Sequence, residues 1–242
     1  MDLLEAIEAR HAIRAYTDEP VAADTLTALE SDIARWNEES GLHMQIGAGL
    51  DDAFCGLKTH YGRFQGVHNA IALICPAAGS VANGEAALSP EEAALQERVG
   101  YYGEMAALRA VQLELQTSWA VLDGAAAAAN PWWTLTEGET AVWMIAFGHG
   151  ARAAGRRRTK PMETLASVPG DDFSQAPDWF TAGMEAAMAA PTSLSQQPFH
   201  FTLNDDGTVS AEALDGLFAH VGLGTAKCHF EIGAAPHHVE WR

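Results

Sequence analysis

Apolar residues recur at helical spacing through two segments at the start of the chain. The first, Leu3–Ala15, has acidic residues early and Arg10 and Arg14 late, the order that a helix macrodipole favours. The second, Ala22–Trp36, repeats Leu and Ile at the same spacing after a turn. The pattern therefore predicts two helices before the first strand.

Short apolar runs alternate with longer helical patterns over the rest of the chain. The runs predict strands at Leu42–Ile46, Asn69–Cys75, Ala141–Phe147, His200–Leu203, His229–Ile232 and Val239–Trp241. The helical patterns cover Pro90–Leu122, Trp179–Ala189 and Ala211–His220, with a short helical extension at Ala125–Ala129. Helices that alternate with mostly separated strands predict an α+β or mixed α/β fold.

One segment interrupts this pattern near the middle of the chain. Residues Gly148–Pro161 are rich in Gly and Arg and have no hydrophobic period. We therefore expect a boundary there, with residues 1–150 as an N-terminal half and 151–242 as a C-terminal half of one compact unit.

Composition narrows the classes of partner. The chain has 242 residues, 48% of them hydrophobic, and a net charge of −18 from 14 basic and 32 acidic residues. A globular protein is expected, and general binding to nucleic acid or anionic membrane is disfavoured because both need a field of cations. The sequence has no apolar run of about 20 residues and no secretory signal pattern, so a cytoplasmic location is expected.

The few cations are concentrated locally. Five of the 14 lie in one short stretch: Arg152, Arg156, Arg157, Arg158 and Lys160. The stretch is either a phosphate clamp or a solvated linker. Arg10 and Arg14, four residues apart on the predicted helix, could grip one phosphate or carboxylate, or could instead form a solvated C-terminal turn.

A polar stretch near the C-terminus offers a second candidate site. Ala190–Phe199 combines hydroxyls, amides and two prolines, which suits the edge of a polar heteroaromatic ring or, alternatively, an ordinary loop between a helix and a strand. Gly222–Thr225 lacks the full glycine fingerprint of a dinucleotide site, and the adjacent Cys228 and His229 would point apart. No metal-ligand or hydrolase motif is found, so no metal is expected.

Four segments together resemble the FMN-dependent nitroreductase family. Glu8–Tyr16, followed by Pro20-Val21, looks like the family's opening motif, and Ala190–Phe199 resembles its glutamine-proline loop beside the flavin ring. Leu113–Trp119 is similar to the end of its core helix, and Ala141–Gly150 to the strand and glycine turn before its basic tail. The resemblance implies a nitroreductase-like α+β fold, with a mixed central sheet surrounded by helices.

The order of these segments departs from the usual family. The glutamine-proline loop normally follows the N-terminal helices, whereas here it lies far downstream. This order resembles a branch in which one long chain supplies both halves of the usual dimer. It implies a monomeric pseudo-dimer, with a homodimer as the alternative.

The resemblance assigns cofactor-binding positions residue by residue. They are Arg10, His11, Ala12, Arg14, Arg157, Arg158, Ser195, Gln196, Gln197 and Pro198. It places Arg10 toward the phosphate and Arg14 toward the phosphate or the O2 edge of the flavin, with Arg157 or Arg158 in the basic tail. Ala12 stands where the family has Ser, and Ser195 where it has Asn, so each position loses a polar group or part of its reach.

The activity that the resemblance implies is carried by the cofactor, with no catalytic side chain. FMN would take a hydride from NADH or NADPH and pass electrons to a nitroaromatic, a quinone or a similar small-molecule acceptor. The competing hypothesis is a non-catalytic flavin-fold protein that binds FMN, or has lost it, and serves sensing or assembly. The departures at Ala12 and Ser195 motivate this alternative.

Overall fold

The computed structural model describes residues 1–76, 88–124, 128–153, 155 and 157–242. The chain divides into two compact units. The first contains Met1, Ala9–Ala82 and Met105–Arg156, and the second contains Asp2–Glu8, Asn83–Glu104 and Arg157–Arg242. The predicted extension at Ala125–Ala129 lies partly outside the described residues.

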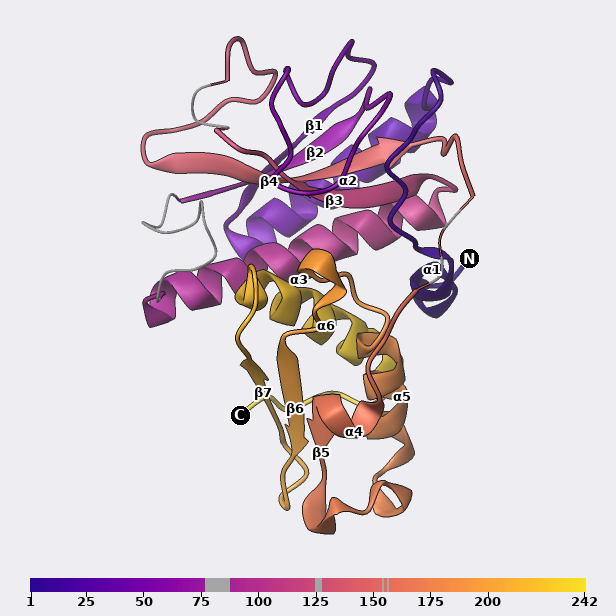
Figure 1. Ribbon diagram of the computed structural model, residues 1–242, viewed down its shortest axis with the longest axis vertical. Helices are drawn as coiled ribbons and strands as arrows, with labels where there is room; N and C mark the ends of the chain where they lie inside the picture. The colour runs from indigo at the N-terminus through magenta and orange to yellow at the C-terminus, as the bar shows by residue number, and fades with distance from the viewer. Residues whose placement is uncertain (77–87, 125–127, 154, 156) are drawn as a thin grey trace. The chain divides into compact units, whose positions relative to one another are not determined.

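A four-stranded antiparallel sheet forms the core of the first unit. Its strands follow the order β1-β2-β4-β3 (Figure 1) and comprise β1 (His43–Gly47), β2 (Ala70–Pro76), β3 (Gln116–Val121) and β4 (Glu139–Gly148). Helix α2 (Ala23–Ser40) packs beside β1. The predictions of a helix, two strands and the β4 strand in this region are confirmed.

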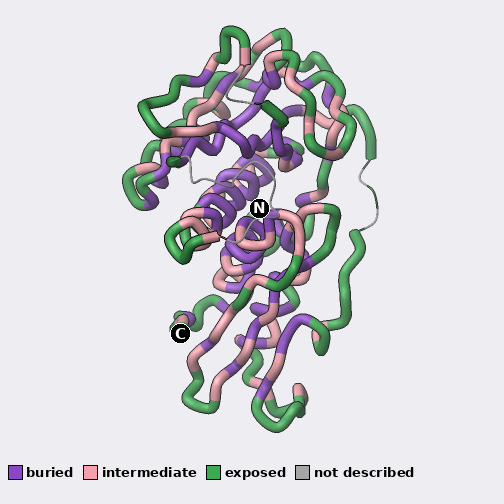
Figure 2. Tube along the Cα trace, turned by 60° about the vertical axis from the view of Figure 1, so that its left-hand side comes forward, coloured by how far each residue is buried: buried purple, intermediate pink, exposed green. Residues whose placement is uncertain are grey.

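The two central strands are buried on both faces. Every residue of β2 except Pro76 is buried, and so are the last eight residues of β4. Buried residues lie mainly in the interior strands and helices, and exposed ones mainly in loops (Figure 2). The apolar runs of the sequence arise from this two-sided burial, because neither face of the central strands meets water.

The first predicted helix is shorter than its apolar pattern. Helix α1 covers Leu3–Ala9, and the chain is then extended. Ile13 N–H donates to the Thr117 carbonyl at 3.0 Å, and Tyr16 N–H donates to the Gln65 carbonyl at 3.0 Å. Ile13 and Tyr16 are buried in the core of the first unit. Backbone pairing and burial override the local helical pattern, so Arg10 and Arg14 do not share a helix face.

The long predicted helix also ends early. Helix α3 covers Pro90–Gln112, and Glu114 adopts a φ of 66° that no helix continues. Leu115 N–H still donates to the Ala110 carbonyl at 3.0 Å, which closes the last turn. Residues Gln116–Val121 of the predicted helix instead form β3, because they pair antiparallel with Trp143–Gly148 of β4.

The second unit combines helices with a three-stranded sheet of order β5-β6-β7. The strands are β5 (Ala166–Ser167), β6 (Phe199–Leu203) and β7 (Val209–Ala213). Besides α1 and the first part of α3, the helices are α4 (Met162–Leu165), α5 (Asp178–Ala187) and α6 (Ala219–Ala234). Single 3-10 turns cover Pro169–Asp171, Phe173–Gln175 and Ser193–Ser195.

Two predictions in the second unit are wrong. Residues 211–213 belong to strand β7, not to a helix, because they pair antiparallel with β6. His229–Ile232 lies inside α6, where Phe230 is fully buried against Phe180 and Phe201. A short apolar run does not distinguish a strand from a buried helix, and burial on several sides decided the outcome here. At Val239–Trp241, only an isolated bridge from Trp241 to Val209 is present.

Helices α3 and α6 approach closely at two glycines of the second unit. A Cβ at Gly224 would lie 1.9 Å from the Glu97 carbonyl oxygen, and one at Gly100 would lie 2.1 Å from the Val221 carbonyl oxygen. Glu97 also receives hydrogen bonds from α6, including Lys227 Nζ at 2.7 Å. Gly100 and Gly224 are therefore required by backbone contact between the two helices.

A buried polar pair lies along the same helix contact. His229 Nε2 is 2.9 Å from Glu104 Oε1, and neither side chain is exposed. His229 Nδ1 is 3.0 Å from the Ala186 carbonyl, which can only accept, so Nδ1 carries a proton. A further proton must lie between Nε2 and the carboxyl group. The pair is therefore neutral as a whole, which lowers the cost of burying it.

We expect Gly224→Ala to destabilise the second unit by about 1–3 kcal/mol, because the new methyl group would force the two helices apart. Helix propensity alone would instead stabilise it by about 1 kcal/mol. A denaturant unfolding curve shows whether the free energy of unfolding falls or rises in the variant. Gly155→Ala is the control, since nothing lies within 4 Å of its Cβ position. An unchanged or raised midpoint for Gly224→Ala would contradict the close contact.

Candidate functional site

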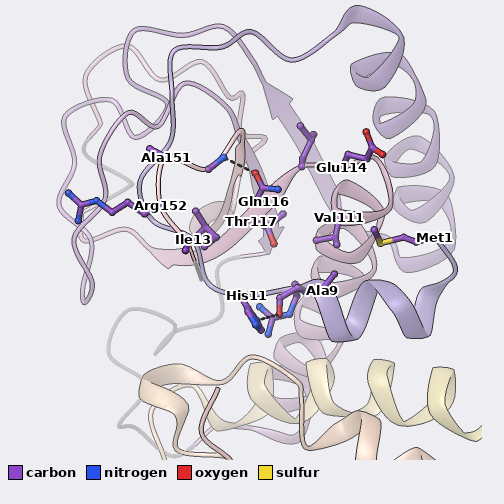
Figure 3. Close-up of a pocket in the computed structure, with 14 residues that line it drawn as sticks. Met1, Ala9, His11, Ile13, Val111, Glu114, Gln116, Thr117, Ala151 and Arg152 are labelled. Carbon is purple, nitrogen blue, oxygen red and sulfur yellow. Dashed lines mark hydrogen bonds between the residues drawn. The ribbon is translucent and has the colours of Figure 1, made fainter. Parts of the chain in front are cut away.

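A pocket of about 720 Å³ lies within the first unit. Its polar walls come from the segment after α1, from the start of β3 and from the segment after β4 (Figure 3). The lining residues are Met1, Ala9, Arg10, His11, Ile13, Val111, Glu114, Leu115, Gln116, Thr117, Gly150, Ala151, Arg152 and Ala153. Two predicted site residues, Arg10 and His11, therefore line one cavity.

Backbone pairing fixes the three walls to one another. Ala12 pairs with Thr117 in parallel, and Ala151 N–H donates to the Ala15 carbonyl at 2.8 Å. The Gln116 side chain joins the other two walls, because its Oε1 accepts the Gly150 N–H at 2.7 Å (Figure 3). A Cβ at Gly150 would lie 3.1 Å from Ile13 Cγ2. Glycine is thus favoured where the β4 segment turns past the pocket.

The pocket has a local excess of positive charge. Arg10 is only 5% exposed, whereas Arg152 is exposed and extends outward from the other labelled side chains (Figure 3). His11 is half-buried, with Nδ1 3.1 Å from the Arg10 carbonyl. Glu114 is the one carboxylate among the lining residues. Two guanidinium groups and one carboxylate line the cavity, and in a chain of net charge −18 this local positive charge favours a phosphate or carboxylate ligand.

Tyr16 braces the extended segment behind the pocket. Its hydroxyl lies 2.6 Å from the Ile13 carbonyl and 3.0 Å from the Ala146 carbonyl of β4. Burial raises the pKa of Tyr16 well above its ordinary value, and the charge of Arg14 offsets only part of this effect. The phenol therefore stays protonated and holds the segment against the sheet.

Two predicted site residues on the same segment lie outside the pocket lining. Ala12 is exposed, and its pairing with Thr117 involves the backbone alone. Arg14 lies over the Phe64 ring at 5.9 Å, and its Nε is buried without a hydrogen-bond partner in the described part of the chain. The structure thus separates Arg14 from the cavity lined by Arg10.

The second unit places the glutamine-proline motif in an unusual loop. Leu194, Ser195 and Gln197 have φ angles of 52°, 55° and 46°, a region that side chains larger than glycine rarely adopt. Ser195 and Gln196 are exposed, whereas Gln197 and Pro198 are buried. Such backbone strain often marks a functional loop, so it keeps this loop among the candidate surfaces.

Gln197 is held by its own unit. Its Oε1 accepts the Lys160 N–H at 2.7 Å, and its Nε2 donates to the Met188 carbonyl at 3.1 Å and to Thr159 Oγ1 at 3.1 Å. These contacts occupy the amide, so Gln197 orders the loop. Gln196 Oε1 accepts the Leu217 N–H at 3.0 Å and is less fully engaged.

The residues of the basic stretch between Arg152 and Lys160 also differ in their surroundings. Arg157 Nη2 donates to the Ile7 carbonyl in the last turn of α1 at 3.0 Å, a bond that satisfies a helix-terminal acceptor. Arg158 is exposed. Arg156 lies outside the described residues. Of the cluster seen in the sequence, Arg152 is the residue that lines the pocket of the first unit.

A comparison with protein families identifies the chain. Residues 2–234 match the family described as "Putative TM nitroreductase". The chain belongs to this nitroreductase family. No curated protein gives a significant sequence match.

Several solved structures share the fold. One from Thermotoga maritima has a TM-score of 0.59 at 16% identity, covering 96% of this chain and 83% of that chain. One from Streptococcus pneumoniae has a TM-score of 0.50 at 15% identity, covering 68% and 98%. A gut-bacterial enone reductase has a TM-score of 0.52 at 12% identity, covering 67% and 95%. The expected mixed α+β fold is confirmed.

Sequence reasoning missed part of the first-unit pocket. Gln116 and Thr117 lay in a segment predicted as helix, so their place on a strand edge was hidden. Arg152 was grouped with Arg156, Arg157 and Arg158, which the sequence alone could not separate. The signal that could have found the pocket is the glycine turn that directly follows the apolar β4 run, because strand ends commonly position binding residues.

No helix in the described part of the chain is long and apolar enough to cross a membrane. Over the same residues, no cluster of three or more His, Cys, Asp or Glu side chains could hold a metal ion. Cys55, Cys75 and Cys228 are free thiols. Burial raises the pKa of Cys75 to about 12, so it remains protonated near neutral pH.

We expect Gln116→Ala to loosen the pocket wall after β4. The Gly150 amide would lose its acceptor and exchange with solvent at least several-fold faster, because a bond of this kind contributes about 1 kcal/mol. Hydrogen exchange at Gly150 measures the effect. Gln65→Ala is the matched control, because the Gln65 side chain is exposed and only its backbone pairs with the extended segment. Equal exchange in both variants would exclude the Gln116 brace.

Proposed function

We propose that this nitroreductase-family protein is an FMN-dependent NAD(P)H oxidoreductase, and that the first-unit pocket holds the FMN phosphate. The observation that carries the proposal is a buried arginine, Arg10, lining a cationic cavity in an otherwise acidic chain. Family membership supports an oxidoreductase. The cofactor, the electron donor and the acceptor are parts of the proposal.

The residues present fit the phosphate end of FMN. The cavity volume falls within the range of about 300–1,000 Å³ typical of ligand sites. Arg10 and Arg152 offer charge-assisted donors, and the absence of a side chain at Gly150 leaves its backbone close to the cavity. Ala12 adds no hydroxyl here, so the guanidinium groups would supply most of the phosphate affinity.

FMN, when bound, supplies hydride chemistry: it is reduced by NADH or NADPH and then reduces a small-molecule acceptor. The role of the chain is to bind and orient. Arg10, fixed at the end of α1, would hold the phosphate, while Arg152 at the rim would close over it. Arg14 remains the candidate for the negative charge that develops near the flavin O2 edge on reduction.

The other predicted FMN-binding positions remain proposals, and the structure supports them to different degrees. They are His11, Arg157, Arg158 and Ser195–Pro198. His11 lines the pocket, whereas Arg157 and Gln197 are engaged by structural hydrogen bonds of the second unit. Ser195 and Gln196 are the exposed members of the loop and the better candidates for the flavin ring. The downstream position of this loop favours a monomeric pseudo-dimer over a homodimer.

We expect Arg10→Ala to weaken FMN binding by roughly 10- to 100-fold, because one or two charge-assisted hydrogen bonds to phosphate are lost. Arg152→Ala, at an exposed position that leaves the core intact, should weaken it less, by roughly tenfold. The absorption spectrum after flavin loading and desalting measures occupancy. Arg35→Ala, which removes a distant surface arginine paired with Asp32 and Glu39, should retain FMN. Full occupancy in both pocket variants would exclude this phosphate site.

Turnover is tested separately on the flavin-loaded protein. We expect oxidation of NADH or NADPH in the presence of nitrofurazone, a quinone or an activated alkene; the alkene is included because a structural neighbour is an enone reductase. Acceptor-dependent oxidation would establish the enzyme. Full flavin loading without oxidation would instead favour the non-catalytic flavin-fold alternative, in which FMN serves sensing or assembly.

A further inference from the structure

A second pocket lies in the first unit, built almost entirely from one loop. Its volume is about 690 Å³, and residues between Asp51 and Val67 supply its lining. None of the residues assigned above to the FMN phosphate belongs to it. The loop meets the extended segment directly, because Gln65 N–H donates to the Arg14 carbonyl at 2.9 Å.

The loop is held in place by the end of β3. Thr59 pairs with Leu122, His60 N–H donates to the Val121 carbonyl at 2.8 Å, and Asp123 N–H donates to the Lys58 carbonyl at 2.9 Å. These bonds fix the backbone from Lys58 to His60. The pocket is therefore preformed, which reduces the entropy cost of binding a ligand.

Aromatic rings form one side of this pocket. Phe54 and Phe64 meet edge to face with centroids 5.2 Å apart, and both line the cavity. The Arg14 guanidinium lies over Phe64 at 5.9 Å. A planar ligand ring could pack against Phe64, which is only half-buried.

The pocket also has cations without acidic partners. Lys58 and Arg63 line it, are exposed, and form no ion pair within the part of the chain that the structure describes. Arg14 Nε adjoins the same space, because a Cβ at Gly62 would lie 3.0 Å from it. Its Nε is buried and has no hydrogen-bond partner among the described residues.

Two carboxylates line the pocket as well. Asp52 is occupied by the loop itself, since its oxygens accept the N–H groups of Phe54 at 2.9 Å and Gly56 at 2.7 Å. Asp51 is exposed and would oppose an anion. Lys58, Arg63 and the nearby Arg14 together outweigh the two acids by one positive charge.

We propose that this pocket is a subsite for an aromatic group that carries a phosphate or carboxylate. The ring would pack against Phe64, and the anionic group would bind Lys58 and Arg63. Two sources share this chemistry: the phosphorylated adenosine end of NADPH and an aromatic acid that serves as electron acceptor. The catalytic use of the subsite rests on the proposed function, but the binding itself does not.

The test measures binding of two probes to the intact protein by titration calorimetry, with and without FMN. Adenosine 2′,5′-bisphosphate represents the dinucleotide, and 4-nitrobenzoate represents the acceptor. We expect one of them to bind, and Arg63→Ala and Lys58→Ala each to weaken that probe roughly tenfold, because each removes a charge-assisted contact. FMN occupancy should not change in either variant.

The controls separate this inference from the proposed function. Arg35→Ala should bind both probes as the unchanged protein does. Arg10→Ala should lose FMN but keep the probe, so loss of flavin and loss of the subsite are distinct results. Binding of neither probe at millimolar concentration, or binding that Lys58→Ala and Arg63→Ala leave unaltered, would overturn the subsite. Preferential binding of the bisphosphate would assign the subsite to the adenosine end of NADPH. Preferential binding of 4-nitrobenzoate would assign it to the electron acceptor.

Discussion

The pairing of the extended segment after α1 with the rest of the first unit underlies both of its pockets. Ile13 bonds to Thr117 at the start of β3, Tyr16 to Gln65 of the loop, and Ala15 to Ala151 after β4. Three parts of the chain that are distant in sequence thus bond to one short extended segment. Arg10 and His11 at one end of this segment face one pocket, and Arg14 near the other end adjoins the second.

This pairing has a clear physical basis. The edge of β3 presents backbone groups that must be satisfied, and an extended segment supplies donors and acceptors at matching spacing. Burial of Ile13 and Tyr16 adds the hydrophobic contribution, and the buried Tyr16 hydroxyl lies within hydrogen-bond distance of the Ile13 and Ala146 carbonyls. Charged side chains on the same segment can then face solvent-accessible cavities without destabilising the core.

The sequence predicted the parts of the fold that burial on two faces determines. The apolar runs of β2 and β4 were predicted as strands, and they form strands because each pairs with a neighbour on both sides and is buried on both faces. It failed where local and tertiary preferences compete. Ile13, Trp119 and Phe230 fit either a helix or a strand by spacing, and their structure depends on partners more than 20 residues away. A sequence motif pointed to Arg10 and His11, which line the first-unit pocket. The hydrogen bond from Gly150 to Gln116 could not be predicted, because it depends on strand pairing that residue spacing does not encode.

The competition between local pattern and tertiary contacts also explains why the predicted cations have different surroundings. Arg14, Arg152 and Arg157 look equivalent as charges in a sequence, yet each has a different environment. Arg157 satisfies the end of α1, Arg152 borders a cavity, and Arg14 lies against an aromatic ring with its Nε lacking an acceptor. A guanidinium that already donates to a helix carbonyl would have to break that bond to bind an anion, and one with a buried, unsatisfied donor would gain from doing so. Local hydrogen-bond satisfaction, more than net charge, therefore ranks the candidate ligands of an anionic cofactor in this chain.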